Sequence, residues 1–175
     1  WAKRTLWEET TRVPLIFAGP GIVTDQRCSR PVGLIDVFPT LLDLVHLPKR
    51  TDLEGRSLTP LLENPKSQWN RPALCTFGPN NHSLRGNRYR YSRYADGSEE
   101  LYDHQNDTNE WNNLISDQAT SVESRQIADQ MKRWLPNNNA TPVLGSAGSD
   151  SPLYGEGTIS LGEAMKRGAA KQKSE

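Results

Sequence analysis

The pattern of apolar and polar positions predicts alternating strands and helices in the first part of the chain. A continuous apolar run over residues 13–18 ends at a Gly-Pro-Gly sequence. Such a run, short and stopped by glycine and proline, predicts a buried strand of a mostly parallel sheet. A second apolar stretch, residues 32–35, leads directly into a segment with helical spacing. A strand followed by a helix that packs back onto a sheet is typical of the α/β class.

The helix after the second strand is expected over residues 36–47. Asp36 stands where a side chain can cap the helix N-terminus, and Pro39 falls in the first turn, where a missing N–H costs little. Pro48 ends the pattern. A turn and one short helix are expected within residues 54–62.

After residue 71 the pattern changes to short strands. Segments rich in aromatic and β-branched residues cover 73–77, 83–85, 89–94 and 99–102. Turn-forming residues separate them, and Asp96-Gly97 is the sharpest hairpin signal. This part therefore predicts an antiparallel meander.

A last helix is expected to cover one face of that small sheet. Ser116 or Asp117 could cap it, and Trp134 lies near its end. The residues of its expected apolar stripe are Val122, Ile127, Met131 and Trp134.

Composition and charge argue against several classes of function. Formal net charge is +0, so no overall electrostatic attraction to nucleic acid is expected. The longest apolar run is strand-sized, so no membrane span is expected. Residues 137–175 carry few large apolar side chains, and we expect this tail to be disordered. The two cysteines, Cys28 and Cys75, could pair, but no feature of the sequence requires it.

No complete active site can be assembled from these residues. The sequence has no evident Ser/His/Asp set and no glycine-rich phosphate loop, and its three histidines stand in unrelated contexts. Cys28 lies in a polar loop between arginines, where a cysteine is usually without catalytic function. If the chain serves an enzyme, most of the catalytic groups are expected upstream of residue 1.

Several motifs, in order along the chain, resemble those of type I sulfatases, the formylglycine-dependent sulfate ester hydrolases. They are Trp1-Ala2-Lys3, Arg12 to Gly21, Asp36-Val37-Phe38-Pro39-Thr40-Leu41-Leu42, Gly55-Arg56-Ser57-Leu58, Arg88 to Asp103, and Asn109-Glu110-Trp111-Asn112-Asn113-Leu114. Together they cover most of residues 1–135. Thr108 stands where the family commonly has proline. The overall sequence pattern of the chain is most similar to that of the iduronate-2-sulfatase-like group.

The resemblance implies a fold and a division of the chain. The fold is the C-terminal part of an alkaline-phosphatase-like α/β sandwich, followed by a small antiparallel sheet with one covering helix. Residues 1–70 would end the catalytic α/β domain, and residues 71–136 would form the C-terminal subdomain.

The resemblance also implies a reaction, the release of sulfate from a sulfated sugar, such as an iduronate-2-sulfate-type substrate. In the family a cysteine is converted to formylglycine, whose hydrate attacks sulfur beside a bound Ca²⁺. The modified cysteine and the Ca²⁺ ligands are expected upstream, so the isolated chain is predicted to be inactive.

Two residues carry the predicted site. In the family the lysine at the position of Lys3 directs its ammonium group at the sulfate, where a fixed cation stabilises growing negative charge. The alternative is a solvated surface lysine. His82 is expected in a loop between strands, where it could hydrogen-bond a sugar hydroxyl or carboxylate. The alternative is an exposed loop histidine with no function.

Two rival functions remain open at this point. A phosphoester or phosphonate hydrolase could use the same scaffold. Alternatively, the chain could be a non-catalytic glycan-binding module, because arginines alternate with tyrosines near residues 88–91. Period-2 alternation places Arg88 and Arg90 on one face of a strand, although such a face is more often the wet side of a half-buried sheet.

Overall fold

The computed structural model describes residues 5–116 and 121–137, and these form two compact units. One unit contains residues 13–73 and 85–87. The other contains the described residues of 1–12, 74–84 and 88–175. The break near residue 73 lies close to the boundary expected at residue 70, but residues 5–12 group with the small sheet. Except for residue 137, the tail expected to be disordered lies outside the described residues.

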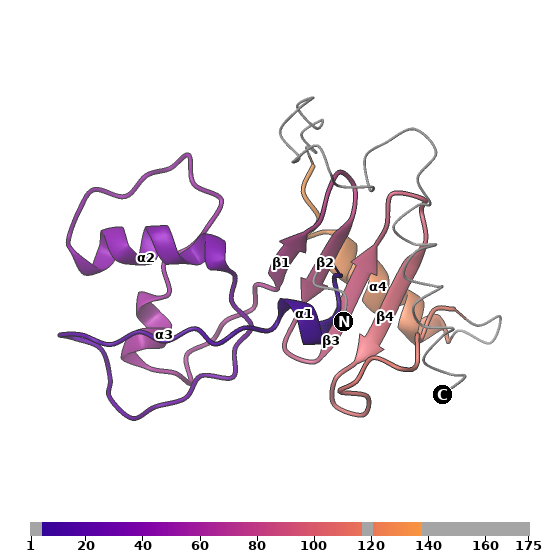
Figure 1. Ribbon diagram of the computed structural model, residues 1–175, viewed down its shortest axis with the longest axis horizontal. Helices are drawn as coiled ribbons and strands as arrows, with labels where there is room; N and C mark the ends of the chain where they lie inside the picture. The colour runs from indigo at the N-terminus through magenta and orange to yellow at the C-terminus, as the bar shows by residue number, and fades with distance from the viewer. Residues whose placement is uncertain (1–4, 117–120, 138–175) are drawn as a thin grey trace, which may run out of the picture. The chain divides into compact units, whose positions relative to one another are not determined.

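The second unit is built on a four-stranded sheet in the order β1-β2-β3-β4 (Figure 1). The strands are β1 (Ala73–Thr76), β2 (His82–Arg85), β3 (Tyr89–Arg93) and β4 (Glu99–Asp103). Strands β3 and β4 are antiparallel, with Tyr91 opposite Leu101. The turn between them contains Gly97 at a φ of 82°, a conformation that favours glycine. The predicted meander is therefore confirmed.

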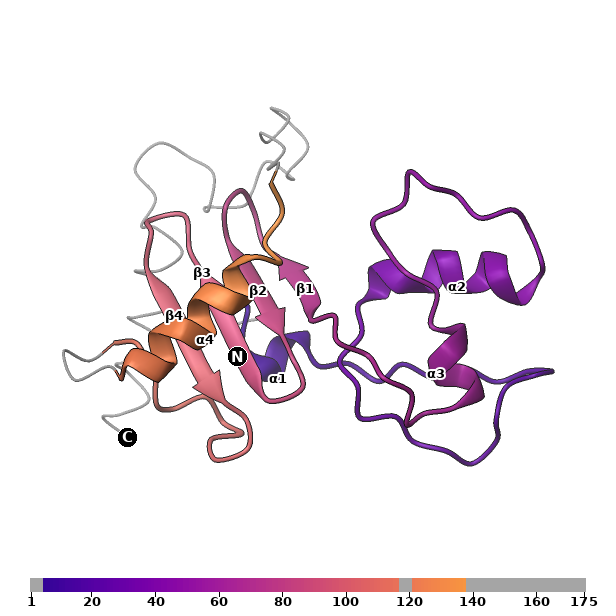
Figure 2. The same cartoon turned by 180° about the vertical axis from the view of Figure 1, so that it is seen from behind.

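Helix α4 (Val122–Lys132) covers one face of the sheet (Figure 2). Ala128 packs there against Tyr91 and Leu101 in the main core cluster. The cap is Ser121, whose hydroxyl accepts from Ser124 N at 3.1 Å, so the caps expected at residues 116 and 117 were wrong.

Only part of the predicted α4 stripe packs on the sheet. Ile127 and Met131 do so, whereas Val122 and Trp134 are exposed. The fully buried residue of α4 is Ala128, whose small side chain lets the helix backbone approach the sheet closely.

The opposite face of the sheet is covered by the N-terminal segment. Helix α1 (Glu8–Thr11) lies across it, on the other side from α4 in both views (Figures 1 and 2). Leu6 is fully buried there and packs in a small cluster with Tyr94. The sheet is therefore buried on both faces, by segments from opposite ends of the described chain.

The first unit is organised by one aspartate. Its helices are η1 (Leu34–Asp36), α2 (Val37–Leu44) and α3 (Thr59–Glu63). Asp36 is the N-cap residue of α2, as the sequence predicts, but its side chain makes no capping hydrogen bond to that helix. Its carboxylate accepts instead from Gly33 N at 3.0 Å and Arg56 N at 2.8 Å. The Thr40 hydroxyl donates to the Asp36 carbonyl at 2.5 Å and accepts from Leu58 N at 2.8 Å. These bonds join the start of α2 to the segment before α3.

The two strands expected in this unit are absent from the structure. Residues 13–18 have no regular secondary structure, and Ile16 is 85% exposed. Residues 32–35 lead into the short helix η1 instead. A strand needs a neighbour for its backbone hydrogen bonds, and no described segment supplies one to these residues. Several apolar side chains of α2, including Phe38 and Leu41, are also exposed.

None of the helices within residues 5–116 and 121–137 has the length and apolar character needed to cross a membrane.

Candidate functional site

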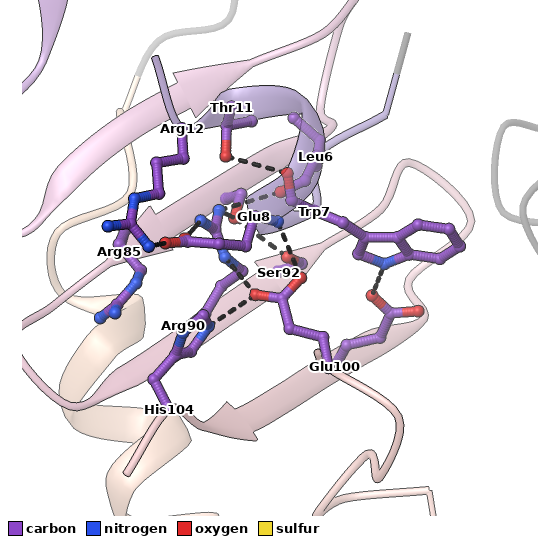
Figure 3. Close-up of polar contacts among 12 residues, drawn as sticks. Leu6, Trp7, Glu8, Thr11, Arg12, Arg85, Arg90, Ser92, Glu100 and His104 are labelled. Carbon is purple, nitrogen blue, oxygen red and sulfur yellow. Dashed lines mark hydrogen bonds and ion pairs between the residues drawn. The ribbon is translucent and has the colours of Figure 1, made fainter. Parts of the chain in front are cut away.

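The face of the sheet beneath α1 carries a buried ion network centred on Arg90. The Arg90 side chain is 2% exposed, although the sequence favoured a solvated position. Its guanidinium donates to the Leu6 carbonyl at 2.9 Å and to the Ser83 hydroxyl at 2.9 Å. It also pairs with the Glu8 carboxylate. Figure 3 shows Arg90 reaching from the sheet toward Leu6 and Glu8. A buried guanidinium is stable only when it is paired and hydrogen-bonded, and here it is both.

Glu110 is the second carboxylate of the network, and its side chain is 3% exposed. One oxygen lies 2.6 Å from Arg90 Nε and 2.7 Å from His104 Nε2. The other accepts from the backbone N–H of Glu8 at 2.9 Å. The Glu110 backbone has a φ of 59°, in the left-handed region that non-glycine residues rarely adopt. The three contacts of its carboxylate therefore hold a backbone conformation that costs energy.

A third polar contact fixes Trp7. Its indole Nε1 donates to Glu100 at 3.1 Å, and the Tyr94 hydroxyl donates to the same oxygen at 2.6 Å. The Trp7 and Glu100 side chains meet beside the Arg90 network in Figure 3. Burial raises the pKa of Glu100 above its usual value, and the two donated hydrogen bonds partly oppose this shift. Three consecutive residues, 6–8, are thus bound to the sheet by separate contacts.

The network does not provide a Ca²⁺ site. Among the described residues, one group of three possible metal ligands lies together: Glu8, His104 and Glu110. Both carboxylates already face the Arg90 guanidinium, whose positive charge occupies the position that a cation would need. His104 Nε2 carries a proton, because the Glu110 carboxylate it contacts can only accept. The structure therefore gives no support for Ca²⁺ bound by these residues.

Of the two predicted site residues, Lys3 lies outside the described residues. His82 lies in the structure, but at the start of β2 and not in a loop, and it is 1% exposed. Its Nδ1 is 2.9 Å from the Thr76 hydroxyl. The expected loop position was therefore wrong, because the strand begins one residue earlier than the pattern predicts.

Arg88 and Arg90 do not form the shared glycan-binding face that the alternation predicts. Arg88 lies just before β3, and its guanidinium stacks on Tyr89 and binds Asp103, the residue opposite Tyr89, so it lies on the α4 side of the sheet, whereas Arg90 faces α1. Each of the two arginines also has an acidic partner. Arg88 binds Asp103 through two hydrogen bonds of 2.8 and 2.7 Å. This pair lowers the pKa of Asp103 to about 2. Because both positive charges are compensated, the structure does not favour the binding-module alternative.

Sequence reasoning missed Glu8 and assigned no role to Glu110. Glu110 stood within a motif that resembles a sulfatase signature, and that was the available signal. Its partners Glu8 and Arg90 are 102 and 20 residues away in the sequence, so the signature could not reveal the network.

The cysteines carry no part of the site. Cys28 and Cys75 are both free thiols. Burial raises the pKa of Cys75, which disfavours a reactive thiolate.

Comparison with known proteins identifies the family. Residues 1–139 match the family model described as N-sulphoglucosamine sulphohydrolase, C-terminal. A sulfatase from Formosa agariphila is 34% identical over 170 residues, covering 95% of this chain and 33% of that protein. A Delta 4,5-hexuronate-2-O-sulfatase from Bacteroides thetaiotaomicron is 33% identical over 142 residues, covering 71% of this chain and 29% of that protein.

The solved structures agree with these relatives. The structure of a 2-O GAG sulfatase matches with 28% identity and a TM-score of 0.56, covering 79% of this chain and 34% of that one. The chain thus spans about a third of the length of the proteins it matches. The match confirms the expected fold class, an α/β chain of the alkaline-phosphatase-like type with a small antiparallel sheet. The chain belongs to the sulfatases, in the family described as N-sulphoglucosamine sulphohydrolase, C-terminal.

Proposed function

We propose that the whole protein hydrolyses sulfate esters of a sulfated sugar, and that this chain supplies Lys3 to the sulfate group. The family match over residues 1–139 carries the proposal. The hexuronate-2-O-sulfatase and the 2-O GAG sulfatase among the similar proteins support a sugar sulfate as the substrate class. Within that class we propose a 2-O-sulfated hexuronate, such as an iduronate-2-sulfate-type unit.

The chemistry assigns Lys3 a role that a lysine performs well. Hydrolysis adds water to sulfur, breaks the bond between sulfur and the ester oxygen, and yields inorganic sulfate and the sugar alcohol. Negative charge grows on the sulfate and ester oxygens as that bond breaks. A fixed ammonium group near them stabilises the transition state more than the ground state, and this difference raises the rate.

The rest of the catalytic chemistry is proposed to lie in other parts of the whole protein. Formylglycine would supply the nucleophile and Ca²⁺ would neutralise sulfate charge, as the family resemblance implies. We propose no direct sugar contact for the described His82 side chain, because it is buried against Thr76. A contribution of His82 to substrate binding would have to pass through the shape of the β1–β2 region.

The test is sulfate release by the whole protein from a 2-O-sulfated hexuronate disaccharide, measured by ion chromatography. We expect turnover with the wild type and a fall of about a hundredfold or more in kcat/KM for Lys3→Ala. Residues 1–175 alone should show no turnover. A phosphonate monoester serves as the competing substrate. Faster hydrolysis of that compound than of every sulfate ester tested would favour the phosphonate hydrolase alternative.

A further inference from the structure

The loop after β4, residues 104–114, presents a tryptophan to solvent. Trp111 is 77% exposed, the highest exposure of any aromatic residue within residues 5–116 and 121–137. We propose that Trp111 is a binding site for an uncharged pyranose ring of the polysaccharide that carries the sulfated unit. The inference deepens the proposed function and rests on it, because it takes a sugar polymer as the substrate.

The backbone on both sides of Trp111 is fixed by hydrogen bonds. The Asp107 carboxylate accepts from the N–H groups of Trp111 at 3.1 Å and Asn112 at 2.8 Å. The next residue, Asn113, accepts from Leu101 N at 3.0 Å and so attaches the loop to β4. The indole therefore extends from a backbone that is already ordered. A ligand that stacks on it would bind with little further loss of backbone entropy.

Trp111 contributes little to the packing of the fold. Trp7, in contrast, packs against the cluster of Leu6 and donates its indole N–H to Glu100. Burial of an indole removes a large apolar area from water, and Trp111 forgoes most of that gain. Tryptophan is well suited to a binding surface, because it offers a large rigid contact area with only two side-chain torsions to fix.

The other exposed residues of this loop carry neutral polar groups. They are Gln105, Asn106, Thr108, Asn109 and Asn112. An amide side chain both donates and accepts hydrogen bonds, as the hydroxyl groups of a sugar do. The C–H groups of a pyranose ring form an apolar face, and their partial positive charge suits the negative face of an indole. An indole in a loop of amides therefore matches the chemistry of an uncharged sugar ring.

The charge of the loop disfavours an anionic ring at this position. Residues 95–124 contain no lysine or arginine. Arg88 reaches the start of the loop, but its charge is paired with Asp103. A sulfate or carboxylate group over Trp111 would face the Asp107 carboxylate, which repels it. The proposed ligand is therefore an uncharged hexose or N-acetylhexosamine unit of the polymer.

The experiment measures binding of an uncharged probe to the whole protein by isothermal titration calorimetry. The probe is a polysaccharide of alternating hexuronate and N-acetylhexosamine units that has been desulfated and carboxyl-reduced. We expect Trp111→Ala to weaken binding about three- to tenfold, because one aromatic contact is lost, and Trp111→Phe to keep most of the affinity. The matched control is Trp134→Ala, which removes a second exposed tryptophan of the same unit. Its affinity should stay within about twofold of the wild type.

Equal affinity of the wild type and Trp111→Ala for the probe would overturn the inference. A loss of affinity that appears only with the sulfated polymer would also overturn it, because the ring bound by Trp111 would then be anionic. A large fall in the melting temperature of Trp111→Ala would show that the indole packs against another part of the whole protein, and would exclude a sugar site.

Kinetics on the sulfated polysaccharide connect the site with the substrate. Trp111→Ala should raise KM for this polymer and leave kcat unchanged, because the contact is made equally in the ground state and the transition state. An unchanged KM would overturn the role of Trp111 in holding the substrate. The calorimetric titration needs no turnover. A wild type that releases no sulfate would therefore remove the proposed function, while the titration would still decide whether Trp111 binds a sugar.

Discussion

Replacing Glu110 by alanine tests the buried network most directly. The substitution removes a carboxylate that accepts from the Glu8 backbone N–H, contacts His104 Nε2 and forms an ion pair with Arg90. Arg90 would remain buried with one carboxylate partner in place of two. Breaking a buried pair in this way costs about 3–5 kcal/mol, because the remaining charge is left without full compensation. We therefore expect Glu110→Ala to lower the free energy of unfolding by about that amount.

Glycine at the same position separates the side chain from the backbone. At a φ of 59° an alanine carries a left-handed penalty of about 1–2 kcal/mol, which glycine avoids. Glycine also gains entropy in the unfolded chain, which costs about 0.4–1 kcal/mol. The difference leaves Glu110→Gly more stable than Glu110→Ala by about 0–1.6 kcal/mol, and still well below the wild type.

Urea unfolding followed by far-UV circular dichroism gives the free energies, provided that several probes agree on one transition. Hydrogen exchange at the β3 and β4 amides then locates the loss in the sheet. The reasoning would be refuted if Glu110→Ala cost less than about 1 kcal/mol, or if alanine were more stable than glycine. The first result would mean that the Glu110 carboxylate contributes little to the free energy of unfolding. The second would mean that the backbone at residue 110 is not left-handed.

Three further predictions concern the scaffold and its charges. Gly55→Ala should lower the melting temperature, with a cost of about 1–3 kcal/mol, because the new Cβ would lie 2.1 Å from the Ile35 carbonyl oxygen. Arg88 lowers the pKa of Asp103 to about 2, below the pKa of 3.8 that applies to the unfolded chain. The pair therefore stabilises the fold at pH values above 3.8, and this contribution is lost as the pH falls toward 2. Asp103→Asn should abolish this acid-side change, of about 1 kcal/mol after allowance for the half-exposed arginine, in urea titrations between pH 2 and 6. For Glu100 the pKa is raised, so its ionisation destabilises the fold as the pH rises above 4.5, and Glu100→Gln should remove that decline in the same titrations.

The helices and strands that were predicted correctly are those that the local sequence pattern determines. The four strands of the sheet follow from alternation and from turn residues such as Asp96-Gly97, and the face of Arg90 follows from period 2. Helix α3 also lies where the pattern places it. These features depend on neighbours a few residues away, which a sequence displays directly.

The errors arise where a residue's partner is distant. The run over residues 13–18 has a strand-like composition, but a strand exists only when another segment bonds its backbone. Asp36 stands at a helix start, yet its carboxylate binds Gly33 and Arg56 in preference to its own helix. Arg90 was placed on the correct face with the wrong surroundings, because α1 covers that face from 82 residues away.

The motifs that resemble the sulfatases turn out to fix backbone positions in the described residues. Asp36 and Thr40 accept from the backbone at Arg56 and Leu58, and Glu110 accepts from the backbone of Glu8. Asn113 accepts from Leu101 N at 3.0 Å, so the end of the signature secures the edge of β4. None of these contacts leaves a group directed at a substrate, and each has a reason to be kept for stability alone. The catalytic claim therefore depends on kinetics at Lys3, measured in the whole protein.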